Sequence, residues 1–228
     1  MKRLYIIMLA LTICAVSSQA FAQSRTKMAV GGYLGAGASF VAGDGAELIN
    51  IIPRENRTGK FSGAFGVYFD YYFIPSVALE VGLGFNSQGI HWKNNDGEFK
   101  IRHFYMELPV MVKFNIKHFQ IGVGLGLWFA LSGKNTFKNY NNDTTTKHTW
   151  HDNDWDYLHR VNIGPKLQFG YAIPVGPVSL VPSISWSMHL VNDLNRDHYQ
   201  DDYPNVNVDR YRARYNNLMF NFAVEFGF

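Results

Sequence analysis

The amino-acid sequence predicts an all-β protein, an eight-stranded antiparallel up-and-down transmembrane β-barrel. Three observations predict it. Large apolar residues alternate with small or polar ones along most of the chain, aromatic residues make up 16% against only 17% charged residues, and short connections alternate with long ones. About a quarter of a soluble domain is charged, so this composition favours a chain that faces lipid.

The start of the chain has the features of a secretory signal peptide. The basic Lys2-Arg3 pair precedes an almost continuously apolar Leu4–Val16 stretch, and Ala20–Ala22 has the small-x-small pattern of a cleavage site. We therefore expect residues 1–22 to be removed and residues 23–228 to form the outer-membrane barrel domain. After this stretch no run reaches the about 18 apolar residues that a spanning helix needs.

Several kinds of chemistry are disfavoured by composition. The single cysteine, Cys14, would leave with the signal peptide, so thiol, disulfide and cysteine–metal chemistry is not expected. The 21 basic and 18 acidic residues nearly balance, which gives no electrostatic reason to expect a nucleic-acid partner. We expect no cofactor and no resident metal.

The first four predicted strands lie between residues 28 and 116. Alternation matters because successive side chains of a strand point to opposite faces. The first segment is rich in Gly and Ala, the second and third place aromatic and aliphatic residues on one face, and the fourth alternates over thirteen positions. In order they are Met28–Phe40, Phe61–Tyr72, Val77–Trp92 and Phe104–Ile116.

The last four predicted strands alternate more strictly. Their second face carries Gly, Ser, Asn and Gln, and the final segment has a large apolar residue at every even position. In order they are Phe119–Leu131, Val161–Ile173, Val178–Leu190 and Asn217–Phe228. The total of eight is even, as a single-chain bacterial barrel requires.

The connections indicate how the barrel crosses the membrane. Short turns are predicted near 73–76, 117–118 and 174–177, and longer polar segments near 41–59, 93–99, 132–156 and 192–213. Outer-membrane barrels have short periplasmic turns and long external loops, so both termini are expected in the periplasm.

The large apolar face is expected to contact lipid, because the other face is too poor in charge to face water. Thirteen residues from Phe104 to Ile116, at about 3.3 Å each and tilted about 45°, would cover roughly 30 Å of height. The lumen of eight strands is just filled by side chains, so an open diffusion pore is not expected.

Charged residues on the inward face are the first candidate site. A charge in a narrow lumen is costly unless it is paired. Glu80 and Lys113 lie at similar depth on neighbouring strands, so we expect them to meet. The functional interpretation is a gate or conduction path, and the structural one, which we favour, is a stabilising network. By strand phase the set is Asp70, Glu80, Glu107, Lys113, Lys166 and Glu225.

Ser187 and His189 are a second candidate, both inward near the external end of one strand. With a carboxylate, such a pair could acylate or deacylate lipid. Positions two apart on a strand are about 7 Å distant, which is long for a nucleophile–base hydrogen bond. We expect them to line the lumen instead, and we expect the protein not to be an enzyme.

The external segments hold three weaker candidates. The stretch from His148 to Asp154 has metal-like composition without fixed geometry. Asp143–Thr145 resembles a short O-glycosylation motif, in a segment polar enough to be mobile. The Asn192–Arg214 segment places Tyr199, Tyr203 and Tyr211 among Asp and Arg residues, which suits either a partner or surface-glycan contact or an ordered cover over the mouth.

One stretch resembles a motif of the PorT-type outer-membrane β-barrel family of Bacteroidota, within the small OmpA/OmpX-like barrels. It is an aromatic residue, a Glu, a Pro and a Lys at fixed spacing: Tyr105, Glu107, Pro109 and Lys113. The terminal strand, with Phe226 and Phe228, resembles the signal read by the barrel-assembly machinery. Asn162 departs from the family, which often has Asp there. The resemblance implies the fold and an outer-membrane location, and brings no catalytic residues.

Three functions remain open from the sequence. The first is a non-enzymatic outer-membrane barrel whose external loops contact an envelope protein or surface glycan. The second, implied by the resemblance, is an accessory to a secretion or gliding machinery. The third is a lipid-modifying enzyme. Outer-membrane lipid and, during biogenesis, the barrel-assembly machinery are the expected partners in each case.

Overall fold

The structure, a computed structural model, describes residues 27–43, 57–93, 95, 97–149, 158–193 and 213–228. The expected signal peptide and its cleavage site lie outside these residues, as does Cys14. Within the described ranges no helix is long and apolar enough to cross a bilayer.

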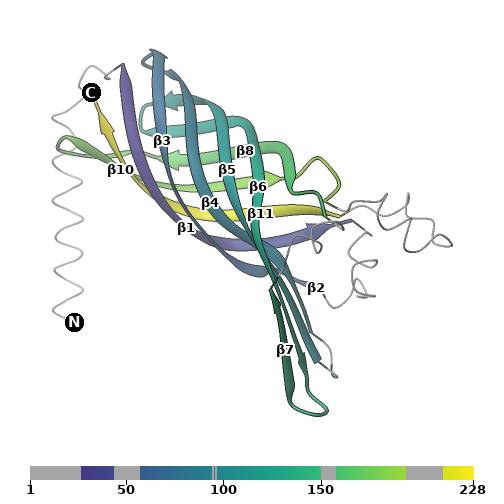
Figure 1. Ribbon diagram of the computed structural model, residues 1–228. Coiled ribbons are helices and arrows are strands. Elements are labelled where there is room, and N and C mark those ends of the chain that lie inside the picture. The colour runs from purple at the N-terminus through teal and green to yellow at the C-terminus, as the bar shows by residue number, and fades with distance from the viewer. Residues whose placement is uncertain (1–26, 44–56, 94, 96, 150–157, 194–212) are drawn as a thin grey trace, which may run out of the picture.

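Eight long strands form a closed antiparallel ring, as the sequence predicted (Figure 1). Neighbours along the chain are neighbours in the sheet, and β11 pairs with both β10 and β1, which closes the barrel. The ring is made of β1 (Met28–Ala42), β3 (Lys60–Ile74), β4 (Val77–Lys93), β5 (Gly97–Ile116), β6 (Phe119–Asn139), β8 (Val161–Tyr171), β10 (Val178–Met188) and β11 (Arg214–Gly227).

Three short strands accompany the ring. β2 (Arg57–Thr58) pairs with β4, β7 (Thr144–Thr149) pairs with β6, and β9 (Ile173–Val175) pairs with β10. The segment predicted as one strand from Val161 to Ile173 is therefore divided, with Ala172 between β8 and β9. The three predicted short turns are present, and Lys117 and Gly176 adopt positive φ in two of them.

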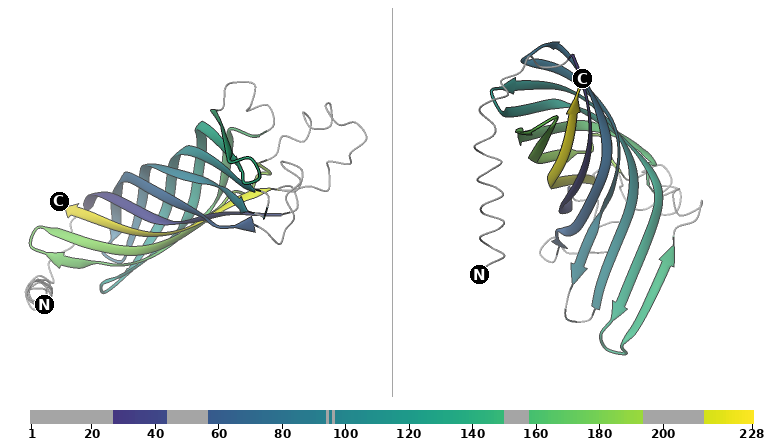
Figure 2. Two further views of the ribbon diagram at one scale, coloured as in Figure 1. Left: turned by 90° about the horizontal axis from the view of Figure 1, so that it is seen from below. Right: turned by 90° about the vertical axis from the view of Figure 1, so that its left-hand side faces the viewer.

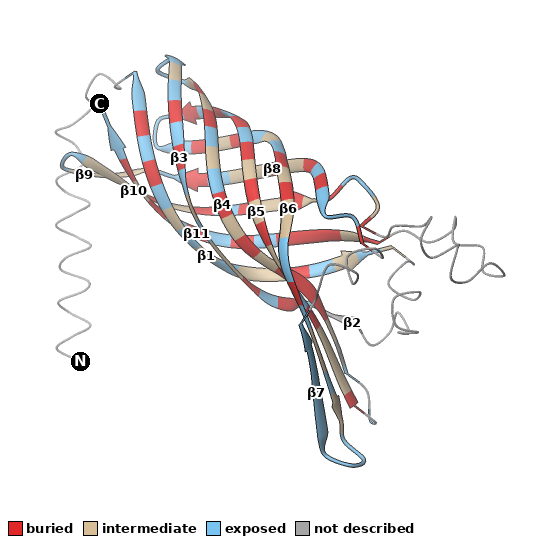
Figure 3. Cartoon of the chain, in the orientation of Figure 1, coloured by how far each residue is buried: buried red, intermediate tan, exposed pale blue. Residues whose placement is uncertain are grey.

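Burial alternates along the ring strands, as Figure 3 shows. The apolar face is exposed on the outside of the barrel, and the buried face inside is mostly polar, with Ser, Asn, Gln, Glu and Lys side chains. This inverted distribution is what a barrel in lipid requires and what a water-soluble barrel would avoid. Aromatic residues at the turn end of the strands are exposed on this outer surface: Tyr71, Phe73, Phe114, Phe119, Tyr171 and Phe228.

The ends of β4, β5 and β6 that lie away from the C-terminus continue past the barrel, where the sequence predicted loops at 93–99 and 132–156. Gly97 pairs with Asn139 at the far end of β5 and β6, and β7 adds a further strand beside β6. We call the part formed by Gly89–Lys93, Gly97–Arg102, Lys134–Asn139 and β7 the projecting sheet. Figures 1 and 2 show it extending beyond the end of the barrel that lies away from the C-terminus.

The loop prediction was wrong here for a physical reason. Most of these residues are polar and charged, and the isolated Phe99 and Phe137 do not make an alternating apolar pattern long enough to mark strands. The pairing comes from the neighbouring strands rather than from burial. The segment expected to be mobile between Asn139 and His148 contains instead the β6–β7 turn and β7.

A β-bulge marks the base of the projecting sheet. Phe104 pairs with Ser132 while the adjacent Tyr105 pairs with Ala130, so Leu131 has no partner in the ladder. The extra residue shifts the phase of β6 by one. Before Leu131 the odd-numbered residues of β6 face outward, and after Leu131 the even-numbered residues do.

Candidate functional site in the lumen and the projecting sheet

Lys113 lies at the centre of a group of charged side chains in the lumen, near the barrel end that holds the C-terminus. We call this group the lower cluster. Its Nζ lies 2.7 Å from Asp70 Oδ2, 2.8 Å from Glu80 Oε2 and 3.8 Å from Glu225 Oε2. All four side chains are buried. The contact with Glu80 is the one expected from strand depth, whereas the contact with Asp70 comes from a strand two positions away in the ring.

Tyr68 completes this lower cluster. The Lys113 ammonium lies 4.4 Å from the centre of the Tyr68 ring, a cation–π contact. The Tyr68 hydroxyl donates to Glu225 Oε2 at 3.2 Å, which fixes that carboxylate. Three carboxylates therefore share one ammonium on the inner wall near the end of the barrel that holds the C-terminus.

Glu107 belongs to a second cluster higher in the lumen. Lys166 Nζ donates to Glu107 Oε1 at 2.6 Å, and Asn86 Nδ2 donates to Glu107 Oε2 at 2.7 Å. Gln88 donates in turn to Asn86 at 3.1 Å. Lys166 reaches Glu107 from β8, which lies two positions from β5 in the ring, so Glu107 is separate from the Lys113 cluster.

The space left between the clusters is small. A cavity of about 30 Å³ is lined by Tyr33, Glu80, Glu107, Lys166 and Ser185, among others. A cavity needs roughly 10–15 Å³ to hold one water, so this one has room for very few. The arrangement can hold buried charge and a little water, and it gives no room for a solute.

The end of the lumen away from the C-terminus is filled by a cluster of rings. His189 lies 4.8 Å from Trp128 and 5.5 Å from Tyr105, measured between ring centres, and Tyr215 lies 5.8 Å from His189. Gly126 faces the Trp128 indole, and a side chain at that position would meet the ring. Trp128, Tyr105 and His189 are almost completely buried, so the cluster closes this end of the barrel.

Asp193 anchors the ring cluster, and sequence reasoning did not single it out. His189 Nδ1 lies 2.7 Å from Asp193 Oδ1, and the Tyr215 backbone N–H donates to Asp193 Oδ2 at 2.9 Å. Asn162 Nδ2 also donates to Asp193 Oδ1, at 3.1 Å. Asp193 is four residues beyond His189, past the end of β10, so no strand pattern could place it.

Ser187 and His189 are both inward and buried, as strand phase predicted. His189 has the carboxylate that a catalytic pair would need. Its other ring nitrogen, Nε2, is buried and has no hydrogen-bond partner among the described residues, so none of their hydroxyls is positioned there to be deprotonated.

Most other external candidates lie outside the described residues. These include His151, Asp152, Asp154, Tyr199, Tyr203 and Tyr211. His148 lies on β7, and Asp143 in the β6–β7 turn adopts a positive φ of 48°. Among the residues that the structure describes, no group of three or more His, Asp or Glu is arranged to hold a metal ion.

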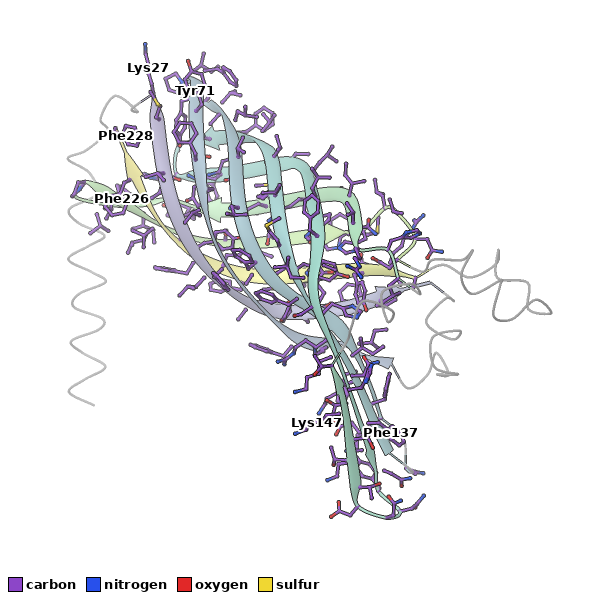
Figure 4. All side chains as sticks on the ribbon, viewed as in Figure 1. Lys27, Tyr71, Phe137, Lys147, Phe226 and Phe228 are labelled. Carbon is purple, nitrogen blue, oxygen red and sulfur yellow. The ribbon has the colours of Figure 1, made fainter. Side chains whose placement is uncertain are left out.

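The projecting sheet ends in an exposed edge. All six residues of β7 are exposed, and in the described part of the chain β7 pairs with β6 alone. Phe99 and Phe137 lie opposite each other on one face, with ring centres 6.5 Å apart. In Figure 4, Phe137 and Lys147 lie on this sheet, far from Lys27, Tyr71 and Phe228 at the other end of the barrel.

Residues 21–188 match the model of the outer membrane protein beta-barrel domain family. The chain belongs to this family. The match covers most of the ring strands, and it agrees with the closed ring and the exposed apolar surface. This outer membrane protein matches no curated protein sequence at a significant level.

Solved outer-membrane barrels share the architecture at low similarity. Neisserial surface protein A is 11% identical, with a TM-score of 0.43 over 90% of this chain and 100% of that one. Ail of Yersinia pestis, solved with the heparin analogue sucrose octasulfate, is 11% identical, with a TM-score of 0.42 over 88% of this chain and 99% of that one. The outer membrane protease OmpT from Escherichia coli is 10% identical, with a TM-score of 0.40 over 91% and 99%.

Proposed function

We propose that this outer membrane protein is a non-enzymatic, closed barrel that works at the cell surface by contacting a partner through its projecting sheet and external loops. The observation that carries the proposal is the exposed edge of β7. A sheet edge presents a row of backbone N–H and C=O groups to which an extended segment can add, and natural barrels normally remove such edges.

The edge has the properties of a surface for strand addition. Four of the six β7 residues are Thr, a residue enriched in strands, and every one is exposed. An extended peptide could pair with this edge while its side chains contact the neighbouring Phe137, which is 41% exposed. The partner chemistry that fits is an extended segment of a protein in the envelope or on the surface.

The lumen supports a role outside the barrel rather than conduction through it. Two buried ion-pair clusters and the ring cluster around His189 occupy the inside, and the cavity among them is about 30 Å³. Moving a solute through this lumen would require several buried ion pairs to break, each at a cost of several kcal/mol.

Two features support a non-enzymatic role. The His189–Asp193 pair is enclosed by Trp128, Tyr105 and Tyr215, and His189 Nε2 has no hydroxyl partner. A nucleophile activated by His needs a hydrogen bond to that nitrogen. A lipid-modifying activity would predict a changed mass of the outer-leaflet glycolipid in cells that overproduce the protein.

The alternative role is an accessory to a secretion or gliding machinery, which the Tyr105, Glu107, Pro109 and Lys113 motif suggests by its resemblance to the PorT-type family. This alternative shares the partner contact and adds that the complex is stable. The two versions therefore differ in whether the partner stays bound during extraction.

A photo-crosslinking residue introduced at Thr146 tests the partner contact in intact cells. We expect one discrete adduct from Thr146 and none from the matched control at Phe119, which is also exposed but lies at a periplasmic turn. Equal labelling at both positions, or none at Thr146, would contradict the proposal. A native gel of the extracted protein then separates the alternatives: a large complex indicates the accessory role, and a lone heat-modifiable barrel indicates a transient contact.

A further inference from the structure

The outward face of the projecting sheet is strongly basic. Direct pairing places its residues in three rows across β4, β5, β6 and β7, and residues opposite each other in a ladder share a face. The rows are Gly89, Arg102, Lys134 and Thr149; His91, Lys100, Thr136 and Lys147; and Lys93, Glu98, Lys138 and Thr145.

Cations greatly outnumber anions among the described residues of this sheet. Arg102, Lys134, Lys93 and Lys147 are exposed, while Lys100 and Lys138 are partly exposed. The acidic residues are Glu98, which binds Lys100 and His91 at 2.6 Å each, and Asp143, 3.6 Å from Lys138. Among the ion pairs between described residues of this sheet, none joins Arg102, Lys134 or Lys147 to an acid, so the described part of the surface has a positive excess.

This face continues the lipid-facing surface of the barrel without a break. Arg102 precedes Phe104 by two positions on β5, so the two side chains point the same way. Phe104 stacks on Phe85 with ring centres 5.9 Å apart, and Phe85 stacks on Phe65 at 5.3 Å. An outward-facing aromatic band, made of half-buried Phe85 and Phe104 and exposed Phe65, thus lies directly below the first basic row. The bulge at Leu131 keeps Lys134 on this same side.

The height of the rows matches the headgroup layer. Two residues along a strand tilted by about 45° rise roughly 5 Å, so the three rows lie at about 5, 9 and 14 Å above the aromatic band. The polar headgroup region of one leaflet is about 5–8 Å thick. Arg102 and Lys134 therefore fall within the headgroups, and the second row borders them.

We propose that this basic face binds the phosphorylated headgroups of the glycolipid in the outer leaflet. Charge complementarity and continuity with the lipid-facing surface favour this ligand over a soluble polyanion, which could not use the aromatic band. The face is opposite the one that carries Phe137, so the interaction leaves the aromatic face and the β7 edge free. It is separate from the partner contact proposed above and can fail independently of it.

The test compares two lipids that differ only in phosphate. The full mature protein, folded in an uncharged detergent, is titrated with phosphorylated lipid A or its dephosphorylated form, and the dissociation constants are measured by native mass spectrometry. The variant is Arg102→Gln with Lys134→Gln. The matched control, Lys27→Gln with Lys117→Gln, removes two exposed charges at the periplasmic end, and heat-dependent gel mobility verifies that each variant is folded.

We expect the wild type and the control to prefer the phosphorylated lipid, and the variant to lose about 25-fold in affinity for it. That value follows from about fivefold for each basic residue near an anionic surface. The preference should also weaken in high salt. A preference that is unchanged in the variant, or no preference in the wild type, would overturn the proposal. Heparin that binds more tightly than lipid A, through the same two residues, would overturn the assignment to lipid.

Discussion

Lys113 Nζ lies 2.7 Å from Asp70 Oδ2, in a pair of side chains that are 1% and 0% exposed. The pair joins β5 to β3, which are separated by β4 in the ring. The side chains therefore connect the two strands through the lumen and not through backbone hydrogen bonds of the sheet. Glu80 and Glu225 bind the same ammonium from β4 and β11. One cation therefore links four strands.

Replacing Lys113 by Met should strongly destabilise the barrel. The substitution leaves three buried carboxylates without their cation, and breaking a buried ion pair in this way costs about 3–5 kcal/mol. The measurement is the free energy of unfolding in urea, from protein folded in lipid vesicles. The exposed Lys134→Met is the control and should change stability by less than about 0.5 kcal/mol. Equal stability of the two variants would exclude a stabilising role for the lower cluster.

Glu107 and Lys166 should behave as a coupled pair that is independent of Lys113. Each single substitution, Glu107→Gln or Lys166→Met, leaves a buried partner, so their effects on unfolding should not add. We expect a coupling energy of about 0.5–3 kcal/mol between them and almost none between Lys166 and Lys113. A double variant as unstable as the sum of the singles would show that the 2.6 Å contact contributes little.

Asn162 should not tolerate Asp, although Asp is the residue that the PorT-type resemblance would suggest. Its Nδ2 donates to Asp193 and to the Val191 carbonyl, at 3.1 and 3.0 Å. Asp at 162 would remove both donations and place two carboxylates together, at a cost of about 1–3 kcal/mol. Thermal unfolding should show this loss, and a second substitution, Asp193→Asn, should recover part of it. Wild-type stability of the single variant would rule out this explanation.

Glu98 should titrate below its ordinary range. The Lys100 ammonium binds the Glu98 carboxylate and His91 adds a second hydrogen bond, which holds the pKa of Glu98 below 4.5. A lowered pKa in the folded state means that the contact stabilises the sheet above the ordinary pKa, and the stabilisation is lost as pH falls through the folded value. Carboxyl NMR titration should give a value below 4.5 that rises in Lys100→Gln. A Glu98 pKa at or above 4.5 in the wild type would contradict this stabilising contact with Lys100.

Strand phase was enough to predict the inward position of all six lumen charges, because one residue of shift would move an entire strand face. Strand depth was also enough for the contact between Glu80 and Lys113. The contacts of Asp70 and of Lys166 depend on how the ring closes and on how far each side chain reaches into the lumen. The alternation of residues along a strand carries no information on either.

The sequence pattern did not predict the projecting sheet or the role of Asp193, for different reasons. Residues such as Thr136 and Lys147 form strands through pairing with their neighbours, with no apolar face to reveal them. Asp193 acts from just beyond a strand end, where periodicity has stopped. The bulge at Leu131 reverses the phase of β6, so alternation continued from the barrel would have assigned Lys134 to the wrong face.

The most direct test of the account is the side of the membrane on which each end of the barrel lies. Single cysteines at Lys147 and at Lys117 would be labelled with a membrane-impermeant maleimide, in a background where Cys14 is changed to Ser. We predict that the Lys147→Cys variant is labelled in intact cells and the Lys117→Cys variant only after the outer membrane is permeabilised. Labelling of Lys117→Cys in intact cells, with Lys147→Cys protected, would contradict an outer-membrane barrel that presents its projecting sheet at the cell surface.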